Sequence, residues 1–259
     1  MKSIKPENVI IVGGASGIGF ATAQKILWGG VRSVLLASRS YDKLVKAKLS
    51  LQCEDDQKVY FLEFDITDCQ SHMDFLLKCK EQMGKIPDGL VVSSGINFDG
   101  SNWKGFNISE EAYDKVMDTN LKGVFFLMRN YANYLYENKT PGNICIVSSI
   151  SAHRDLLSVY QIAKNAISGI VHTYGKYLVE KGIVLNCVEP GTTDTDMMPH
   201  LKPYTDGIRP GKPWNDNSIR RVIRPEEIAE IICFLMAEGN EVLSGTCLLA
   251  GGGCKSIAR

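Results

Sequence analysis

One short segment near the start of the chain limits the fold more than any other. Residues 8–19 read Asn-Val-Ile-Ile-Val-Gly-Gly-Ala-Ser-Gly-Ile-Gly: an apolar strand pattern, a glycine-rich turn, and the beginning of an apolar-periodic helix. Gly13, Gly17 and Gly19 let such a turn take left-handed backbone angles and let a phosphate approach the backbone. The next helix offers free N–H groups and a positive dipole end. The segment predicts a strand–turn–helix unit suited to a pyrophosphate, although glycine-rich turns also occur without a ligand.

Strand-like and helix-like segments alternate along the whole chain. Continuous apolar runs are typical of strands buried on both faces, and they occur at 9–12, 33–37, 59–64, 90–92, 144–147, 184–188 and 246–249. Amphipathic stretches between them predict helices at 18–28, 41–51, 69–83, 110–137, 159–181 and 225–237. This order predicts an α/β fold, a Rossmann-type doubly wound parallel sheet flanked by helices on both faces. Because no repeat or linker interrupts it, we expect a single domain over residues 1–259.

Residues 192–224 depart from this alternation. They contain four prolines, two glycines and several charges, which predict an irregular segment. Long irregular insertions in compact domains often serve as lids or binding loops, so we expect a substrate lid here. Together with residues 96–106 it offers apolar side chains to a hydrophobic alcohol or ketone, or to a sugar stacked on an aromatic ring: Met197, Met198, Tyr204, Ile208, Trp214, Phe98, Trp103 and Phe106. The alternative is that these side chains pack the loops themselves.

The charge balance and the cysteines narrow the class of protein. The 29 Lys and Arg residues balance 29 Asp and Glu residues, which argues against a broad nucleic-acid surface. No apolar run approaches the roughly 20 residues of a membrane span, and the first strand follows too soon for a signal peptide. The eight cysteines are scattered, which indicates reduced thiols, mostly in the core. We therefore expect a cytoplasmic protein with no metal, no nucleic-acid partner and no membrane association.

A tyrosine and a lysine stand one helical turn apart in the predicted helix 159–181. Tyr160 and Lys164 share a helix face, because residues four apart lie one above the other. An isolated phenol has a pKa near ~10, and a neighbouring ammonium lowers that pKa by favouring the phenolate. The phenol then serves as a proton donor or acceptor near neutral pH. The same spacing arises by chance on surface helices, so the pair needs support from other motifs.

Further motifs follow the glycine-rich turn in a fixed order. They are Asp65-Ile66, Val92-Ser93-Ser94-Gly95, Asn120, Ser148-Ser149, Tyr160 with Lys164, and Pro190-Gly191-Thr192-Thr193-Asp194-Thr195. In this order they resemble the short-chain dehydrogenase/reductase family over nearly the whole chain, and residues 12–19 are similar to its T-G-x-x-x-G-x-G motif. Val12 departs from the family's threonine, and residues 92–94 stand in place of Asn, Asn and Ala. These departures concern local stability more than chemistry.

The resemblance implies a nicotinamide-dependent oxidoreductase that interconverts a secondary alcohol and a ketone by hydride transfer. In such an enzyme Tyr160 is the general acid in reduction and the base in oxidation. Lys164 lowers the pKa of the phenol and binds the nicotinamide ribose. Ser149 holds the substrate oxygen, and Asn120 anchors a water that connects Lys164 to solvent. No metal is required.

The identity of the catalytic serine stays open on sequence alone. The interval from Ser149 to Tyr160 is two residues shorter than is usual in the family. Alignment of the strand at 144–147 favours Ser149, and Ser151 and Ser148 are the alternatives. His153, just beyond them, either contacts substrate or is an ordinary loop residue.

The second strand ends in Ser38-Arg39-Ser40, where an NAD-preferring fold usually carries Asp or Glu for the ribose hydroxyls. A carboxylate there would repel a 2′-phosphate, whereas the planar guanidinium of Arg39 can pair with one. NADP(H) is the favoured cofactor, and NAD(H), with Arg39 stacked on the adenine, is the alternative. The expected cofactor-binding residues are Gly13, Ser16, Gly17, Ile18, Gly19, Ser38, Arg39, Ser40, Asp65, Ile66, Ser94, Gly95, Asn120, Tyr160, Lys164, Pro190, Gly191, Thr193 and Thr195.

Two other functions and the state of assembly remain open. A catalytically silent, cofactor-binding regulatory protein is the main alternative, although the four expected catalytic residues are all present. Epimerisation or dehydration of a nucleotide-sugar usually needs a long C-terminal substrate domain, which we do not expect here. By analogy with the family, we expect a homotetramer or homodimer built through helices 110–137 and 159–181. Small side chains there would permit close helix approach: Ala163, Ala166, Ser168 and Gly169.

Overall fold

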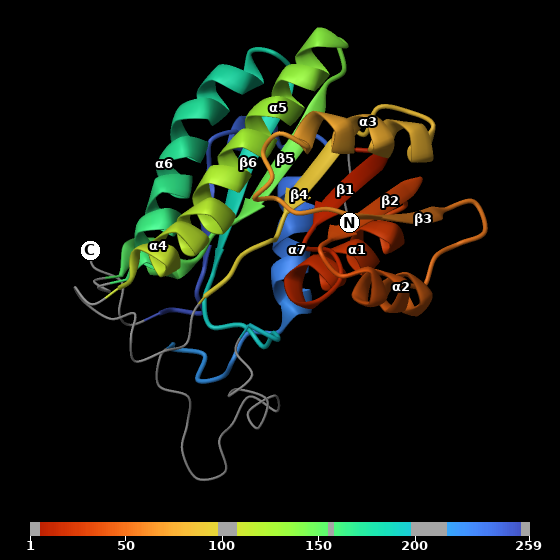
Figure 1. Ribbon diagram of the computed structural model, residues 1–259. Coiled ribbons are helices and arrows are strands. Elements are labelled where there is room, and N and C mark those ends of the chain that lie inside the picture. Colours follow the sequence, from red (N-terminus) through yellow and green to blue (C-terminus); the bar gives the residue numbers. More distant parts are fainter. Residues whose placement is uncertain (1–5, 98–107, 155–157, 198–216, 255–259) are drawn as a thin grey trace.

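A parallel sheet forms the centre of the molecule (Figure 1). The computed structural model describes residues 6–97, 108–154, 158–197 and 217–254. Within them, seven strands lie in the order β3-β2-β1-β4-β5-β6-β7. The strands are β1 (Asn8–Val12), β2 (Ser33–Ser38), β3 (Lys58–Glu63), β4 (Gly89–Val92), β5 (Gly142–Val147), β6 (Ile183–Pro190) and β7 (Cys247–Ala250). All pairings are parallel, which confirms the predicted doubly wound α/β fold.

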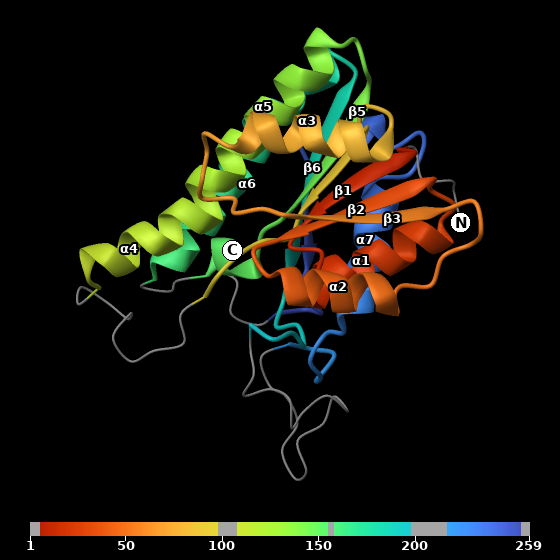
Figure 2. The same ribbon diagram turned by 45° about the vertical axis from the view of Figure 1, so that its right-hand side comes forward.

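Helices cover both faces of the sheet, as predicted (Figure 2). One layer contains α1 (Gly17–Trp28), α2 (Tyr41–Ser50) and α7 (Pro225–Leu235). The other contains α3 (His72–Met83), α5 (Gly123–Glu137) and α6 (Val159–Val179), with α4 (Glu110–Met117) in line with α5 and against α6. Short 3₁₀ turns occupy η2 (Ile150–His153) and η4 (Glu241–Leu243).

The two layers enclose two separate cores because successive residues of a strand point to opposite faces. In β1, Ile10 and Val12 pack with the α3, α5 and α6 layer. Val9 and Ile11 pack with the α1, α2 and α7 layer. All four are at most 1% exposed, and each such burial stabilises the fold by about 1.5–3 kcal/mol. The continuous apolar runs therefore reflect strands with a core on each side.

The predicted helix 110–137 is wrong in one respect, because it is not continuous. A π-helical turn, η1 (Asp118–Lys122), separates α4 from α5 and carries Asn120. A π-turn accommodates one more residue than an α-turn and so changes the direction of the side chains within it. Several other boundaries differ by one to three residues. For example, α3 begins at His72 rather than at residue 69, and β6 continues to Pro190 beyond the predicted end at Val188.

The strand order reverses at β1, which lies between β2 and β4. Val12 pairs with Ala37 on one side and with Val92 on the other, so the three strands end at the same edge. Connections leave this edge in opposite directions, and the divergence opens a crevice where ligands bind in open α/β sheets. The glycine-rich turn lies at this position.

Within the described residues, no helix combines the length and the apolar character needed to cross a bilayer. All eight cysteines are free thiols. Four are buried, namely Cys79, Cys145, Cys187 and Cys233, and Cys53 is exposed.

A buried histidine at the start of α3 gives the fold a defined pH dependence. His72 is 0% exposed, and its Nε2 lies 3.0 Å from the carbonyl oxygen of Ile66. Burial lowers the pKa of His72, because the charged imidazolium is desolvated. As pH falls below about 6.5, the unfolded chain binds a proton that the folded chain does not. The free energy of unfolding should then drop by up to about 1.4 kcal/mol per pH unit.

Urea unfolding over this pH range, with wild type and His72→Gln side by side, measures the effect. Glutamine can still donate to the Ile66 carbonyl but does not titrate. The variant should lose part of the pH dependence between the ordinary and the lowered histidine pKa. A slope that is identical in the two proteins would contradict the assignment to His72.

Candidate active site

A cavity of about 890 Å³ opens at the carboxyl edge of the sheet. Its wall contains most of the residues expected at a cofactor and substrate site: Gly13, Ser16, Gly17, Ile18, Ser38, Arg39, Asp65, Ile66, Ser94, Gly95, Ser149, Tyr160, Lys164, Pro190, Gly191, Thr193 and Thr195. Three expected residues, Gly19, Ser40 and Asn120, are not part of this wall. The fold thus gathers distant segments of the chain into one site, and the three exceptions each contact a residue of the wall, namely Gly13, Ser38 and Ile96.

The glycine-rich turn packs so tightly that a side chain does not fit at Gly13 or at Gly19. Gly13 has φ +84°, and a Cβ there would lie 2.7 Å from the backbone nitrogen of Ser94. A Cβ at Gly19 would overlap the carbonyl oxygen of Gly13. Gly19 therefore serves packing: it lets the first turn of α1 lie directly against the end of β1.

The N-terminus of α1 faces the cavity with its backbone donors available to a ligand. Ser16 is the N-cap in an extended conformation, and its side chain makes no capping hydrogen bond in the described structure. Gly17 and Ile18 belong to the cavity wall. The first N–H groups of a helix have no partner within the helix and carry its positive dipole end, so this end suits an anion.

Asn120 fixes the loop that follows β4. Its Oδ1 accepts a hydrogen bond from the Ile96 N–H at 3.0 Å, and its Nδ2 donates to the Ile96 carbonyl at 2.8 Å. The side chain is 0% exposed. At Gly95, a Cβ would lie 2.9 Å from Asn120 Oδ1 and 3.6 Å from Lys164 Nζ, so the three residues are immediate neighbours. The expected water-anchoring role of Asn120 stays a prediction.

Lys164 and Tyr160 lie together in the wall, on the first turns of α6. The Lys164 ammonium is buried, donates to the Val147 carbonyl at 2.9 Å and lies 5.6 Å from the centre of the Tyr160 ring. Burial lowers the pKa of Lys164 to about 8. Burial raises the pKa of Tyr160, and a hydrogen bond with Ser149 opposes that rise. Ser149 therefore acts on the phenol in this structure, and the expected effect of Lys164 on the phenol pKa stays a prediction.

The three candidate serines have different surroundings. The Ser149 Oγ accepts from the Ser151 N–H at 3.1 Å as the N-cap of η2, and hydrogen bonding from Ser149 opposes the rise in the pKa of Tyr160. Ser148 is buried, and its hydroxyl donates to the Lys164 carbonyl at 3.1 Å. Ser151 lies in the cavity wall one residue into η2. The geometry favours Ser149 as the serine that acts with Tyr160 and gives Ser148 a structural part.

The far end of the cavity is formed by the ends of β2 and β3. Ser38 and the exposed Arg39 belong to the wall, and the Ser40 hydroxyl is the N-cap of α2, accepting from the Lys43 N–H. Asp65 Oδ1 accepts from the N–H and the hydroxyl of Thr67 at 2.9 and 2.8 Å. This fixes the carboxylate at the cavity wall.

Only part of the expected lid is described. Thr192 and Asp194 form backbone hydrogen bonds with Ile223, so the first and last parts of the segment 192–224 lie together. Met197 lines the cavity. The remaining side chains expected at the substrate mouth lie outside the described residues: Met198, Tyr204, Ile208, Trp214, Phe98, Trp103 and Phe106.

The cavity wall also contains residues that the sequence did not single out. Ile96, Asn97, Thr119 and Arg154 are among them. Thr119 stands beside Asn120 and Ile96 follows Gly95, so proximity to a recognised motif could have identified both. Arg154 had no such signal, because it lies between Ser149 and Tyr160, in the interval that is two residues shorter than is usual in the family.

The chain matches known proteins over most of its length. Residues 7–205 match the family model described as short chain dehydrogenase. L-rhamnose 1-dehydrogenase (NADP(+)) of Thermoplasma acidophilum is 30% identical over 98% of this chain and 98% of its own. L-2,3-butanediol dehydrogenase of Corynebacterium glutamicum is 26% identical over 94% and 96%. A solved 3-oxoacyl-[acyl-carrier protein] reductase from Brucella melitensis superposes with a TM-score of 0.84 at 23% identity, covering 99% of this chain and 93% of that one.

Proposed function

Since the chain belongs to the short-chain dehydrogenase/reductase family of NAD(P)-dependent oxidoreductases, we propose that it interconverts a secondary alcohol and a ketone, with NADP(H) as the preferred cofactor. The observation that carries the proposal is that Ser149, Tyr160 and Lys164 line the same cavity as the glycine-rich turn, with the Lys164 ammonium 5.6 Å from the centre of the Tyr160 ring.

The residues of the cavity fit a dinucleotide cofactor. The uncapped first turn of α1 would hold the pyrophosphate, because its N–H groups face the cavity. Asp65 and Ile66 would contact the adenine, and residues 190–195 would lie along the nicotinamide. When bound, the cofactor supplies or accepts the hydride.

Tyr160 moves the proton in this proposal. In reduction its phenol donates to the substrate oxygen, and in oxidation it accepts that proton. The Ser149 hydroxyl holds the same oxygen and stabilises the phenolate by hydrogen bonding. With its pKa near 8, Lys164 is mainly an ammonium at neutral pH, and its charge also favours the phenolate.

Arg39 and Ser38 support the preference for NADP(H). No carboxylate stands at the end of β2 to repel a 2′-phosphate, and Arg39 lies in the wall beside the neutral Ser38. A relative with 30% identity is named as NADP(+)-dependent. NAD(H) is the alternative.

Turnover of a substrate panel tests the proposal. Ketones, steroids, sugars including L-rhamnose, and diols including 2,3-butanediol are offered with NADPH, NADH and the oxidised forms, and the nicotinamide absorbance is followed. Oxidation of a secondary hydroxyl or reduction of the matching ketone is expected. Tight cofactor binding with no turnover across the panel would instead favour a silent regulatory protein.

We also propose a homo-oligomer, formed through α5 and α6. Ile162 and Tyr177 on α6 are 55% and 58% exposed, and Gly169 has open space beside it. Ala163 and Ser168, in contrast, are buried within the chain and do not contribute to such a surface. Size-exclusion chromatography with light scattering should give a dimer or tetramer; a monomer at all concentrations would refute this.

A further inference from the structure

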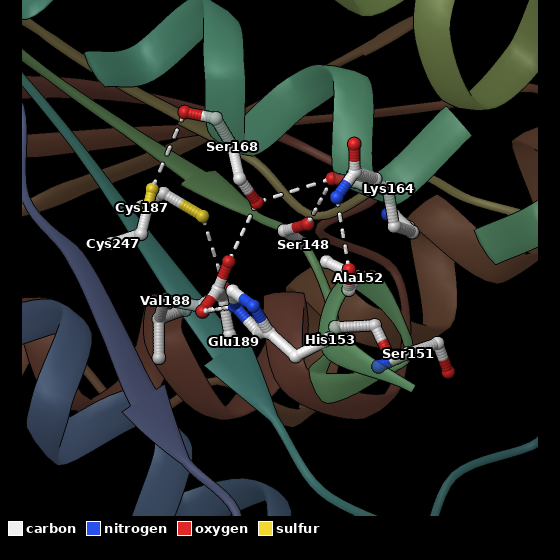
Figure 3. Close-up of polar contacts among 12 residues, drawn as sticks. Ser148, Ser151, Ala152, His153, Lys164, Ser168, Cys187, Val188, Glu189 and Cys247 are labelled. Atoms are coloured by element: carbon white, nitrogen blue, oxygen red, sulfur yellow. Dashed lines mark hydrogen bonds and ion pairs between the residues drawn. The ribbon is translucent and has the colours of Figure 1, made fainter. Parts of the chain in front are cut away.

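A buried carboxylate on β6 is bound on both of its oxygens. Glu189 is 1% exposed. Its Oε1 accepts from the Ser168 hydroxyl at 2.6 Å, and its Oε2 lies 2.7 Å from His153 Nε2 (Figure 3). An ionised carboxylate only accepts hydrogen bonds, so Nε2 of His153 is the donor. Short bonds of this kind, to a charged acceptor, are stronger than neutral ones.

The two partners of Glu189 belong to the two segments that carry the proposed catalytic groups. Ser168 stands on α6, one turn after Lys164. His153 ends η2, the short helix that Ser149 caps. One carboxylate therefore connects the serine segment to the tyrosine–lysine helix, as Figure 3 shows for Ser168, Glu189 and His153.

Other polar contacts join the same two segments. The Ser148 hydroxyl donates to the Lys164 carbonyl at 3.1 Å, and Asn165 Nδ2 donates to the Ala152 carbonyl at 3.0 Å. In both contacts the acceptor is a backbone carbonyl, and another side chain or a water can donate to that carbonyl instead. The Glu189 contacts differ, because they offset the free-energy cost of burying a charged carboxylate. Moving Ser168 or His153 away from the carboxylate would restore that cost.

Two thiols lie beside the same carboxylate. The potential ligand atoms of Cys187, Glu189 and Cys247 lie within 4.8 Å of one another, a grouping that a soft metal such as zinc could use. Both oxygens of Glu189 already accept a hydrogen bond, and burial holds the pKa of Cys187 well above its ordinary value, which opposes a thiolate ligand. Hydrogen bonding therefore accounts for the buried carboxylate.

We propose that Glu189 is a positioning residue, whose carboxylate, held between Ser168 and His153, fixes the Ser149 hydroxyl against the Tyr160 phenol. The proposal rests on the proposed function for its effect on turnover. Its geometric part does not depend on that function. Displacing a reacting group by about 1 Å can cost about a hundredfold in rate. The contacts of Glu189 with Ser168 and His153, here called the clamp, can therefore affect turnover although they do not touch the reacting atoms.

Two variants release the clamp from different sides. In Glu189→Gln the negative charge is lost, and one carboxylate oxygen becomes an NH₂ group, which donates hydrogen bonds and cannot accept them. In His153→Phe the ring is kept but the donor is lost, at a side chain that is 39% exposed and so places little demand on folding. We expect kcat to fall roughly ten- to hundredfold for Glu189→Gln and about tenfold or less for His153→Phe, with an unchanged KM for NADPH.

A matched control removes a buried hydrogen bond elsewhere. The Ser33 hydroxyl donates to Asn8 Oδ1 at 2.8 Å, at the amino edge of the sheet, away from the cavity. Ser33→Ala should lower the melting temperature and leave kcat unchanged. If it lowers kcat as much as Glu189→Gln, general destabilisation explains the loss and the proposal fails.

Two further measurements separate positioning from a merely structural part. In a Ser149→Ala background, Glu189→Gln should cause little additional loss of kcat, because both changes act on one contact. Without any turnover, the NMR signal of isotope-labelled Tyr160, assigned with Tyr160→Phe, should shift in Glu189→Gln in the direction seen for Ser149→Ala. Additive losses of kcat, or an unmoved Tyr160 signal, would overturn the proposal.

The outcomes for the two levels of proposal are distinct. A wild type that turns over nothing defeats the proposed function, while the Tyr160 signal still tests the clamp. Stoichiometric zinc that survives dialysis of the wild type and disappears in Glu189→Gln would make Glu189 a metal ligand and overturn the clamp.

Discussion

Tyr160→Phe is expected to reduce kcat by roughly a thousandfold, within the ~10²–10⁴ that a positioned acid or base contributes. The change removes one oxygen and keeps the ring, so the packing against Lys164 is retained. The substrate oxygen then has no group at that position to give it a proton or take one from it. NADPH affinity should stay close to that of the wild type, because the phosphate-binding turn and Arg39 are untouched.

Steady-state kinetics on the best substrate and titration of NADPH by fluorescence measure the two effects separately. Tyr113→Phe is the control, since Tyr113 lies on α4, is exposed and is not part of the cavity wall. It should retain wild-type turnover. Full activity of Tyr160→Phe would show that another group moves the proton.

Arg39→Asp is expected to shift the ratio of kcat/KM for NADPH to that for NADH by about 10²–10³-fold toward NADH. The change removes a charged hydrogen bond to the 2′-phosphate, worth about 1.5–3 kcal/mol, and adds a carboxylate that repels it. Together these amount to about 3–4 kcal/mol, where each 1.4 kcal/mol is tenfold. The new carboxylate can also accept from the ribose hydroxyls of NADH.

Arg32→Asp is the matched control for this change. Arg32 immediately precedes β2 at the amino edge of the sheet, opposite the cavity. Arg32→Asp therefore changes the net charge by the same amount as Arg39→Asp, but away from the cofactor site. Its cofactor ratio should equal that of the wild type. A wild type that uses NADPH and NADH equally well would contradict the proposed preference.

The fold could be predicted from the sequence because its strands are buried on both faces. Neighbouring residues such as Ile10 and Ile11 pack into different cores, so both faces of the strand are apolar. The strand is therefore visible in the sequence as an unbroken apolar run. The glycine turn was equally clear, since Gly13 and Gly19 occupy positions where a Cβ does not fit. Strand ends were less certain, because a boundary depends on the loop that follows it.

The π-turn at Asn120 could not be predicted from the sequence. Its residues, Asp-Thr-Asn-Leu-Lys, are compatible with a continuous helix, and the turn depends on tertiary contacts such as those of Asn120 with Ile96. The influence of Ser149 on the phenol was missed for a similar reason. The i, i+4 spacing names a lysine neighbour for Tyr160, whereas Ser149 reaches it only through the fold.

The sequence contains a signal at Glu189. It follows Val188, the predicted end of the sixth strand, and the strand continues through it to Pro190. A charged residue next to a run buried on both faces needs a buried partner. That requirement predicts a partner, and only the fold identifies it as His153 and Ser168.

The division into two cores separates two properties of the enzyme. The turn of α1 and Arg39, before α2, belong to one helical layer, and Tyr160 and Lys164 on α6 belong to the other, with the sheet between them. Arg39 follows β2 in one helical layer, and the proton-transfer groups lie on α6 in the other. We therefore expect the free energies of substitutions at Arg39 and at the proton-transfer groups to add. The scaffold is modular in this sense: we expect that the preference for NADPH or NADH and the proton-transfer groups can be altered independently.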